Sequence, residues 1–361
     1  MTLYVYNTAL ERIGLVEDGR SLQWLSEYQD AGEVKLVCSA TEKNRALLAD
    51  GNRLYCTEQP ESAVIRHTQI DDDGKDAKLT VRAVLSAARW ADRVVLGTQR
   101  ITHVEEGMLA LTRTNRRGLP GVTGTAGGRT AVLDTQMTWG SVLDAEKTLA
   151  ASAGLGFRED FDPVTGAETF CVYAGTDRTQ GASYNGYFGD DIGNLSGLRI
   201  VRGSDGWKNR AIVGGQGEGT ERKIVTVDIG SYAGDDLREL WVDARDIGRN
   251  YQLAVPDGSG GVTYTEATYT EAEYEAVLRA RGLEKLAACL QTLEVDASIG
   301  QGLMEYGRDY FLGDIVPLKL TRYGMLLSAR ISAIRTIYEA TGKTVTAVLS
   351  DFKLTKGALH Q

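Results

Sequence analysis

Apolar and polar residues alternate along the C-terminal part of the chain. In segment 327–333 every second side chain is apolar, and the residues between them are two serines and an arginine. This period of two is typical of a half-buried β-strand. After Ile334 the alternation shifts by one residue, which indicates a β-bulge that curls the sheet. Because turn dipeptides stand at 323–324 and 342–343, we predict three antiparallel strands within residues 313–351.

The N-terminal third has a similar pattern of short apolar runs and turn residues. A short helix is predicted over 41–48. Helical spacing of apolar residues predicts a longer helix over 83–93, and Gly97 marks the end of this module. Strands are predicted at 34–37, 53–55 and 63–65, followed by a hairpin over 68–81.

Helical and strand patterns alternate in the middle of the chain. Residues 140–153 place their apolar side chains on one stripe, with Gly154 as a C-terminal stop. A capping box at 270–273 predicts another helix, which Gly282 interrupts before it continues to Leu290. A strand is predicted at 170–173, and a β-meander between residues 193 and 245 with strands at 198–201, 207–213 and 222–227.

Composition excludes some classes of partner. The chain has 361 residues, 42% of them hydrophobic, and the acidic residues exceed the basic ones by 49 to 40, which gives a net charge of -9. Two to four compact modules are therefore expected, without a general affinity for nucleic acid or anionic membranes. An acidic surface would let a polyanion slide past. The 42 glycines and five prolines predict many tight turns and bulges.

Three features of the sequence indicate the cellular compartment: the cysteines, the first residues of the chain and the length of its apolar runs. Cys38, Cys56, Cys171 and Cys289 lie far apart and lack metal-site spacing, so they are interpreted as reduced thiols. The first 13 residues lack a signal-peptide pattern, and no apolar run reaches the roughly 20 residues of a membrane span. These features predict a soluble product that is synthesised and folded in a cytoplasm.

Two charged segments suggest binding sites. The acidic run 71–76 resembles a calcium loop in composition, but its spacing does not match D-x-D-x-D-G and favours a hairpin tip. The stretch 112–130 is rich in glycine and threonine and carries four arginines. It is either a loop that contacts a partner or a phosphate backbone, or an exposed mobile insertion, which we favour. The four are Arg113, Arg116, Arg117 and Arg129.

Nucleotide and zinc motifs fail in detail. The glycines of 214–219 are evenly spaced and lead into a strand, so a hairpin or bulge is predicted instead of a dinucleotide fingerprint. His103 and Glu105 form H-x-E, but the P-C-x-x-C of zinc deaminases is missing, which favours a surface histidine. The other histidines are His67 and His360. No G-x-S-x-G motif is present.

Carboxylates and aromatic residues are the side chains that sugar chemistry would use. Glu159, Asp160 and Asp162 cluster before a proline, and two further acids stand at 190–191. Such acids near turns are interpreted as capping or solvated groups, although carboxylate catalysis stays open. The aromatic residues could form a sugar-stacking surface, but their scatter through separate elements favours core anchors. They are Trp24 and Tyr28, at helical spacing, with Trp90, Trp139, Trp207 and Trp241.

Many short motifs, taken in order, carry a resemblance that covers nearly the full length. The chain resembles the tail baseplate hub proteins of long-tailed bacteriophages. In the first half the matching positions are 21–24, Tyr28, 32–37, Asn44, 47–51, 64–65 and the helix before Arg93. In the second half they are 191–195, 207–209, 213–217, Arg222, 242–245, 313–316 and the final hairpin.

The resemblance implies a β-rich α+β fold with two small β-barrel-like modules and two mixed α/β insert modules. Three subunits would form a ring around a channel and match a sixfold tail tube to threefold fibres or spikes. We place the first barrel-like domain at 1–100, a mixed domain at 101–192, the second barrel-like domain at 193–246 with 313–361, and a helical or mixed insert at 247–312. Many relatives carry a C-terminal peptidoglycan-cleaving domain, whereas this chain stops at Gln361.

The sequence thus predicts a structural, non-enzymatic hub at the tail tip of a virion. Its expected partners are two further copies of itself, the distal tail protein, the tape-measure protein and fibre or spike proteins, with DNA passing through the channel unbound. We assign no catalytic, cofactor or metal residue. Two alternatives remain: a wall-degrading enzyme, which would need a cleft with paired carboxylates such as Asp160 and Asp162, or the hub of a contractile injection machine.

Overall fold

The computed structural model describes residues 1–183, 186–256, 262–289, 292–299 and 303–354. The positions predicted for Leu290, His360 and Gln361 lie outside these residues. The described chain is rich in β-strands and has only four α-helices, α1 (Glu42–Leu47), α2 (Val104–Asn115), α3 (Val142–Ala153) and α4 (Glu271–Ala287). This confirms the β-rich α+β class.

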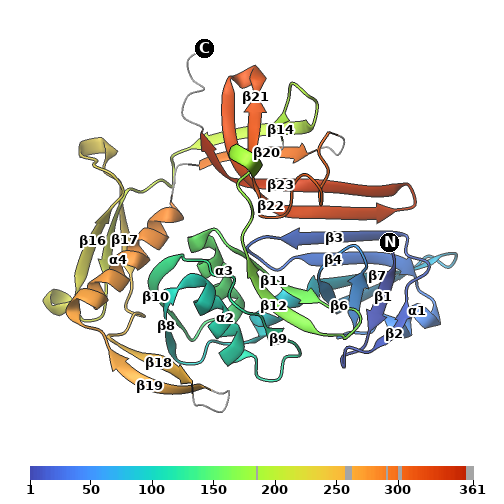
Figure 1. Ribbon diagram of the computed structural model, residues 1–361, viewed down its shortest axis with the longest axis horizontal. Helices are drawn as coiled ribbons and strands as arrows, with labels where there is room; N and C mark the ends of the chain where they lie inside the picture. Colours follow the sequence, from blue (N-terminus) through green and yellow to red (C-terminus); the bar gives the residue numbers. More distant parts are fainter. Residues whose placement is uncertain (184–185, 257–261, 290–291, 300–302, 355–361) are drawn as a thin grey trace.

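One large sheet contains strands from both ends of the chain (Figure 1). Its order is β13-β21-β22-β3-β4-β7-β6-β5-β1-β2, with β23 paired to β22. The N-terminal strands are β1 (Leu3–Tyr6), β2 (Arg12–Leu15), β3 (Ser21–Glu27), β4 (Glu33–Ser39), β5 (Arg53–Cys56), β6 (Ser62–Asp72) and β7 (Ala77–Leu85). The later strands are β13 (Phe188–Gly189), β21 (Ile315–Leu320), β22 (Met325–Glu339) and β23 (Gly342–Leu354).

The β22 strand joins two hydrophobic cores. Its first half pairs with β21, and its second half pairs with β3 from Ala333 to Glu339. The predicted bulge is confirmed, because the register with β23 shifts between Ile331 and Ala333. Ile331 and Ile334 consequently enter the C-terminal core, while Tyr338 enters the N-terminal core. A rigid connection between the two ends of the chain follows from this shared strand.

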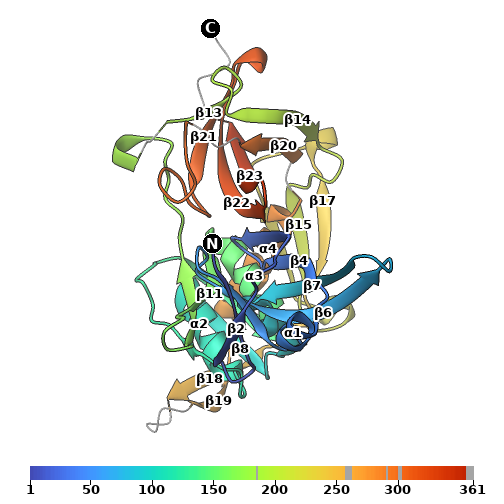
Figure 2. The same ribbon diagram turned by 90° about the vertical axis from the view of Figure 1, so that its right-hand side faces the viewer.

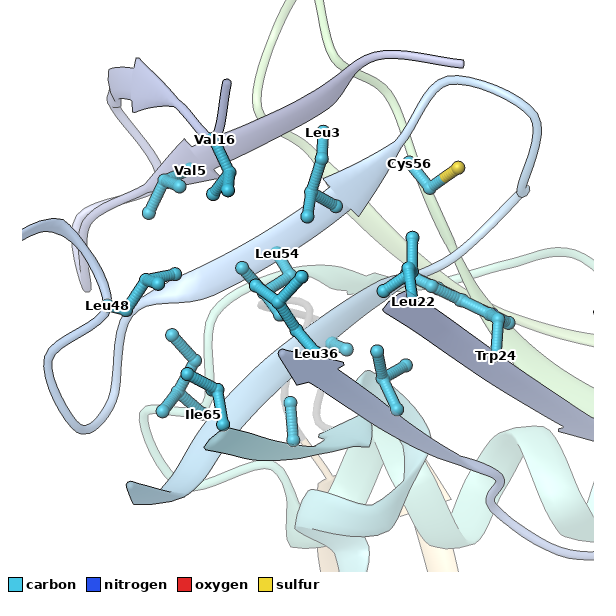
Figure 3. Packing of buried hydrophobic residues seen from close by; sticks show 14 of the residues in the cluster. Leu3, Val5, Val16, Leu22, Trp24, Leu36, Leu48, Leu54, Cys56 and Ile65 are labelled. Atoms are coloured by element: carbon cyan, nitrogen blue, oxygen red, sulfur yellow. The ribbon is translucent and has the colours of Figure 1, made fainter. Parts of the chain in front are cut away.

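The N-terminal core is filled from both sides of the curled sheet (Figure 3). Leu22, Trp24 and Leu36 approach Val5 and Leu54 across its interior. Every second residue is buried in β3 and β4; the strand predicted at 34–37 is part of β4, whereas β3 was not predicted. Beyond this core, the β6–β7 hairpin projects from the body with an exposed tip (Figure 2).

A second core lies beside the first and is built mainly from helices. It is enclosed by the 3₁₀ helix η1 (Ser86–Asp92), by α2 and α3, and by strands from two small sheets. These strands are β8 (Thr98–His103), β9 (Val122–Thr123), β10 (Val132–Thr138), β11 (Gly156–Phe161) and β12 (Glu168–Tyr173). The predicted helix at 140–153 is confirmed as α3, with Gly154 in the left-handed conformation at its C-cap.

The helix predicted at 83–93 was only partly correct. Residues up to Leu85 belong to β7, and only Ser86–Asp92 form a helix, of the 3₁₀ type. Ala83 and Leu85 are two residues apart and point into the first core, as strand residues do. Ala87 and Trp90 are three residues apart and both enter the second core, which suits three residues per turn.

The predicted β-meander at 193–245 is wrong. The strand β14 (Leu195–Gly203) pairs with β20 (Thr292–Ile299), and Leu198 and Ile200 pack on the C-terminal core. A separate sheet contains β15 (Arg210–Gly214), with β16 (Ile224–Asp228) antiparallel and β17 (Glu239–Asp243) parallel to it. Its apolar face packs on α4, so each strand follows the core that buries its side chains.

Helix α4 separates this sheet from the rest of the molecule (Figure 1). It contacts β15, β16 and β17 on one side and β10 on another. The capping box of Thr270 and Glu273 is confirmed. The remaining strands, β18 (Asn250–Pro256) and β19 (Val262–Thr268), extend the sheet of β8 and β10.

Gly282 does not interrupt α4, contrary to the prediction. A Cβ atom at this position would lie 2.8 Å from Val213 Cγ2 and 2.9 Å from Val227 Cγ2. The glycine therefore lets the helix approach the sheet closely, and the helical hydrogen bonds continue through it. Sequence alone could not separate this packing role from a helix break.

Replacing Gly282 by valine should lower the free energy of unfolding by about 1–3 kcal/mol, because the added side chain overpacks this contact. Equilibrium urea unfolding would measure the loss. The matched control is Ala276→Val on an exposed turn of the same helix, where a cost of about 0.5 kcal/mol is expected. Equal losses in the two variants would contradict the packing role.

Candidate functional site

A tyrosine connects the first sheet, the second core and the C-terminal segment. Tyr28, at the end of β3, is completely buried. Its hydroxyl donates to Gly154 O at 2.9 Å and accepts from Gly175 N at 3.0 Å. A Cβ atom on Gly313 would lie 2.2 Å from the tyrosine ring, and Gly313 has a φ of +93°. The C-terminal segment thus reaches Tyr28 only because this residue is a glycine.

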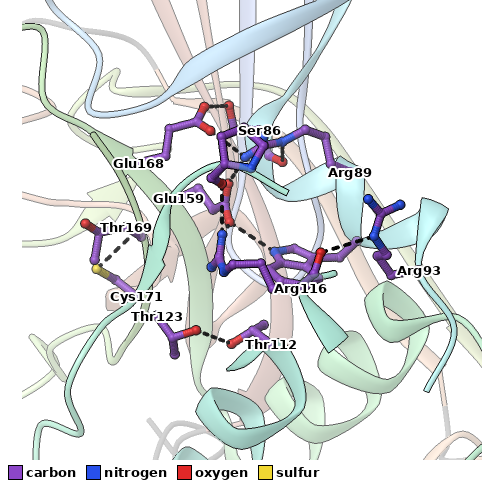
Figure 4. Close-up of polar contacts among 12 residues, drawn as sticks. Ser86, Arg89, Arg93, Thr112, Arg116, Thr123, Glu159, Glu168, Thr169 and Cys171 are labelled. Carbon is purple, nitrogen blue, oxygen red and sulfur yellow. Dashed lines mark hydrogen bonds and ion pairs between the residues drawn. The ribbon is translucent and has the colours of Figure 1, made fainter. Parts of the chain in front are cut away.

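A buried polar network also joins the first module to the second (Figure 4). Glu168 on β12 binds Arg53 on β5, with Nε–Oε1 3.0 Å, and Arg89 on η1, with Nη2–Oε2 2.7 Å. The hydroxyl groups of Ser62 and Ser86 donate to Glu168 Oε1 at 3.0 and 2.8 Å. Since all five side chains are buried, this carboxylate needs these donors to stay charged.

A second buried carboxylate, Glu159 on β11, shares Arg89 with Glu168. Trp90 Nε1 donates to Glu159 Oε1 at 3.2 Å, and Arg116 Nη2 lies 3.7 Å from the same oxygen. The Arg116 guanidinium also stacks 5.0 Å from the centroid of the Trp90 ring. The network therefore ties β5, η1, α2, β11 and β12 together.

The two carboxylates differ in their preference for a proton. Burial raises the pKa of Glu159 to about 7, and its attraction to Arg89 offsets this only in part. Burial also raises the pKa of Glu168, but the charges of Arg89 and Arg53 outweigh it and hold that pKa below its usual range. These groups bind one another inside the protein, so the network acts as a structural connection between modules.

A cavity of about 240 Å³ lies where the first sheet, the β11–β12 hairpin and the C-terminal segment meet. Glu61, Arg158, Tyr173 and Tyr306 line it. Glu61 is only 5% exposed, and burial raises its pKa to about 8. The Tyr173 hydroxyl has no hydrogen-bond partner among the described residues. The cavity therefore offers a protonated carboxyl and a phenol to a hydrogen-bond acceptor.

The acids that the sequence singled out do not line this cavity. Asp160 forms an ion pair with Arg158 at 2.5 Å. Asp162 is exposed, and its carboxylate accepts hydrogen bonds from Val164 N and Thr165 Oγ1. The interpretation of these acids as solvated or capping groups is thus right for Asp162 and wrong for Glu159, which is buried in the network. Its burial depends on β11 packing beside η1, which local sequence does not show.

The other acidic motifs have local structural roles. The 71–76 run forms the tip of the β6–β7 hairpin, where Asp72 and Asp73 accept backbone hydrogen bonds within the turn. At 190–191, Asp190 accepts from Thr321 N at 2.7 Å, and Asp191 pairs with Lys319 at 2.7 Å. Within the described ranges, no group of three or more His, Cys, Asp or Glu residues could hold a metal ion.

The glycine-rich and H-x-E motifs are also accounted for. Residues 214–219 end β15 and begin the loop to β16, as the hairpin prediction required. His103 is exposed, whereas Glu105 is buried. The Glu105 carboxylate accepts from Gly127 N at 2.8 Å and from Arg129 N at 2.7 Å, and it pairs with the Arg129 side chain.

The arginine-rich stretch is thereby attached to the second module over part of its length. Arg116 and Arg129 are held by Glu159 and Glu105, and β9 pairs with β12. Arg113 and Arg117 are exposed. Their exposure fits the favoured interpretation as an exposed mobile insertion, but Arg113 is part of α2 and Arg117 donates to Val94 O at 2.9 Å, so neither belongs to a detached insertion.

The tryptophans divide into two groups. Trp24 and Trp90 are 1% and 0% exposed and anchor cores as predicted, although Trp24 lies on the strand β3 and not on a helix. Trp139 and Trp241 are 68% and 53% exposed, so the core interpretation is wrong for them. Trp207 is half-buried and packs edge-on against Tyr232. The exposed pair is available for contacts with other molecules.

Thiols and membrane segments add no further site. The four cysteines are free, and burial raises the pKa of Cys38 to about 11, which disfavours the reactive thiolate. Of the helices in the described segments, none is long and apolar enough to cross a membrane.

Solved structures of tail proteins, two of them from prophages, share this fold. A tail protein from Neisseria meningitidis MC58 is 14% identical with a TM-score of 0.59, over 97% of this chain and 96% of that one. The prophage tail protein gp18 from Listeria monocytogenes EGD-e is 14% identical with a TM-score of 0.56, over 97% and 94%. A 43 kDa tail protein of prophage MuSo2 from Shewanella oneidensis is 10% identical with a TM-score of 0.57, over 97% and 98%.

A comparison with protein families agrees with the structural one. No curated protein matches the chain significantly. The model of one family, however, matches residues 2–106 and 108–349, which include the four larger hydrophobic cores of the described residues. The chain therefore belongs to the family of Siphovirus ReqiPepy6 Gp37-like proteins.

Proposed function

We propose that this protein is a structural baseplate hub of a phage tail tip. The observation that carries the proposal is the match in fold to three tail proteins, two of them from prophages, over nearly the whole length of both chains. In this role the protein belongs to the virion, and its contribution is assembly and not catalysis.

The division of the chain into modules suits an adaptor. In our proposal residues 1–100 form the first hub domain, and 193–246 with 313–361 form the second, while 101–192 and 247–312 are inserts. Each hub domain acts as a curled, barrel-like unit, and the shared strand β22 keeps the two in a fixed orientation. Three copies then present six such units to a sixfold tail tube and three equivalent faces to fibres or spikes.

The proposed ring encloses a channel for DNA and the tape-measure protein, and it binds the distal tail protein on its tube side. The chain has a net charge of -9. We expect acidic side chains on the channel wall, because positive charge would retain passing DNA.

Imaging the purified protein tests this function. Negative-stain micrographs would be recorded across protein concentrations, alone and with the distal tail protein, and classified without imposed symmetry. Threefold rings with a central hole are the expected result. Particles that stay monomeric at every concentration, even with the distal tail protein, would contradict the hub. Clearing of peptidoglycan in a gel assay would support an enzyme instead.

A further inference from the structure

We propose that neighbouring copies of this chain bind head to tail, with the loop between β16 and β17 of one copy seated on a surface around Trp139 of the next. This inference rests on the proposed function, because the contact would hold together the trimer proposed there. Both surfaces are defined by exposure, charge and hydrogen bonds within one chain.

The acceptor surface is formed by three chain segments near the start of α3. Val94, Leu96 and Trp139 are 45%, 47% and 68% exposed and form its apolar part. Thr98 pairs with Thr138, and Val94 bridges to Ser141. Leu96 and Trp139 lie between these two pairs, so the three apolar side chains are close together on the surface.

Hydrogen bonds hold this surface in place. Val95 N donates to Gly140 O at 2.9 Å, and Val142 N donates to Arg93 O at 2.9 Å. The Arg117 guanidinium donates to Val94 O at 2.9 Å. The apolar side chains are therefore presented on a fixed backbone, which lowers the entropy lost on binding.

The backbone of this surface is also strained. Trp139 has a φ of +39° and Arg117 a φ of +38°, and these are two of the three non-glycine residues with positive φ in the described part of the chain. Side chains disfavour this conformation, and such strain gathers at binding sites. A tryptophan and an arginine held in this way are the residue types that dominate interface energies.

The surface carries positive charge beside its apolar part. The guanidinium groups of Arg93 and Arg117 are held by backbone carbonyl groups and by Asn115. Within the described chain neither has a carboxylate partner. The nearby acids are Asp92, which pairs with Arg66, and Asp144 in the first turn of α3. The surface thus suits an acidic partner with apolar side chains.

The loop between β16 and β17 has the complementary composition. All nine residues of 228–236 are exposed. Ile229 and Tyr232 are 37% and 42% exposed, and Asp235 and Asp236 carry carboxylates without an ion-pair partner in the described chain. In Figure 1 this loop lies at the upper end of the β15–β17 sheet.

A buried asparagine fixes the loop. Asn209 is 2% exposed; its side chain donates to Asp236 O at 2.7 Å and accepts from Arg238 N at 2.9 Å. The backbone carbonyl group of Asn209 accepts from Ile229 N at 2.8 Å. Tyr232 packs edge-on against Trp207, with ring centroids 5.4 Å apart. The loop is therefore a preformed acidic and aromatic projection.

The two surfaces belong to different modules. Val95 and Val142, beside the acceptor surface, lie in the second core. Val227 and Val242, which flank the loop, lie in the core under α4. A contact between unlike surfaces of identical chains is heterologous, and it closes into a ring when the rotation between copies divides a full turn. Opposite charges would select this pairing over contacts between two like surfaces.

Light scattering of the full chain during size-exclusion chromatography tests the contact. Asp235→Lys with Asp236→Lys, or Arg117→Glu alone, should weaken self-association about tenfold or more, and high salt should weaken the wild-type assembly. Matched controls change the same charge elsewhere: Asp50→Lys with Asp205→Lys for the loop, and Arg113→Glu for the acceptor surface. All of these positions are exposed, so the fold should persist, as circular dichroism would show.

Mixing the two variants gives the sharper result. Each variant retains one native surface and their changed surfaces carry opposite charges, so an equimolar mixture should associate more strongly than either variant alone. A chain with all three changes should regain the assembly through Lys–Glu pairs. If wild type and variants form the same ring, the proposed contact is wrong, and the proposed hub function still stands. If the wild type stays monomeric even with the distal tail protein, both are overturned.

Discussion

Replacing Arg89 by methionine should lower the free energy of unfolding by about 3–5 kcal/mol, the largest loss we expect from a single polar substitution. Arg89 is 4% exposed and is shared by the buried carboxylates of Glu159 and Glu168. Its removal leaves two buried acids without their common cation, and methionine cannot supply the lost donors. Equilibrium urea unfolding followed by circular dichroism would measure the change.

Two comparisons make this result specific. Arg66→Met breaks an exposed ion pair with Asp92 and should cost less than about 1 kcal/mol. Adding Glu159→Gln and Glu168→Gln to Arg89→Met should recover part of the loss, because neutral amides are easier to bury than unpaired carboxylates. A loss from Arg89→Met as small as that from Arg66→Met would show that the network contributes little to joining the modules.

Replacing Glu146 by leucine should raise the free energy of unfolding at neutral pH by about 1–3 kcal/mol. Glu146 lies on the buried stripe of α3 with an exposed fraction of 0%. Both of its carboxyl oxygen atoms lack a hydrogen-bond partner among the described residues. A leucine of similar size would keep the packing without a buried, unsatisfied acid.

The effect should depend on pH in a defined direction. Burial raises the pKa of Glu146 well above its ordinary value, so the folded state favours the protonated form. The contribution of this group to stability is complete below the ordinary carboxyl pKa of about 4.3 and is lost as pH rises toward the folded pKa. The advantage of Glu146→Leu over wild type should therefore grow with rising pH.

Comparing wild type with Glu146→Leu at each pH cancels the contributions of the other titrating groups to the free energy of unfolding. Glu61 and Glu159, whose pKa values burial also raises, are present in both. Glu106→Leu, at an exposed position of α2, serves as the control and should show little dependence on pH. A stability difference between wild type and Glu146→Leu that stays constant from about pH 4 to about pH 8 would contradict the assignment.

Features that depend on neighbours in sequence were predicted well. The strands at the C-terminus, the helix α3 and the capping box of α4 each follow from side chains within one turn or one strand. Burial of Glu159, continuity of α4 through Gly282 and exposure of Trp139 were missed. Each of them depends on contacts with residues far away along the chain.

The sequence alone determined the β-rich class and the alternation of the C-terminal strands, because backbone geometry and alternating burial are imposed locally. Its short motifs also carried the resemblance to phage tail hubs. Tertiary structure decided that β22 pairs with β3, that β14 pairs with β20, and which charges share Arg89. Such pairings join residues up to hundreds of positions apart, and burial in a shared core selects them among many partners with the same local pattern.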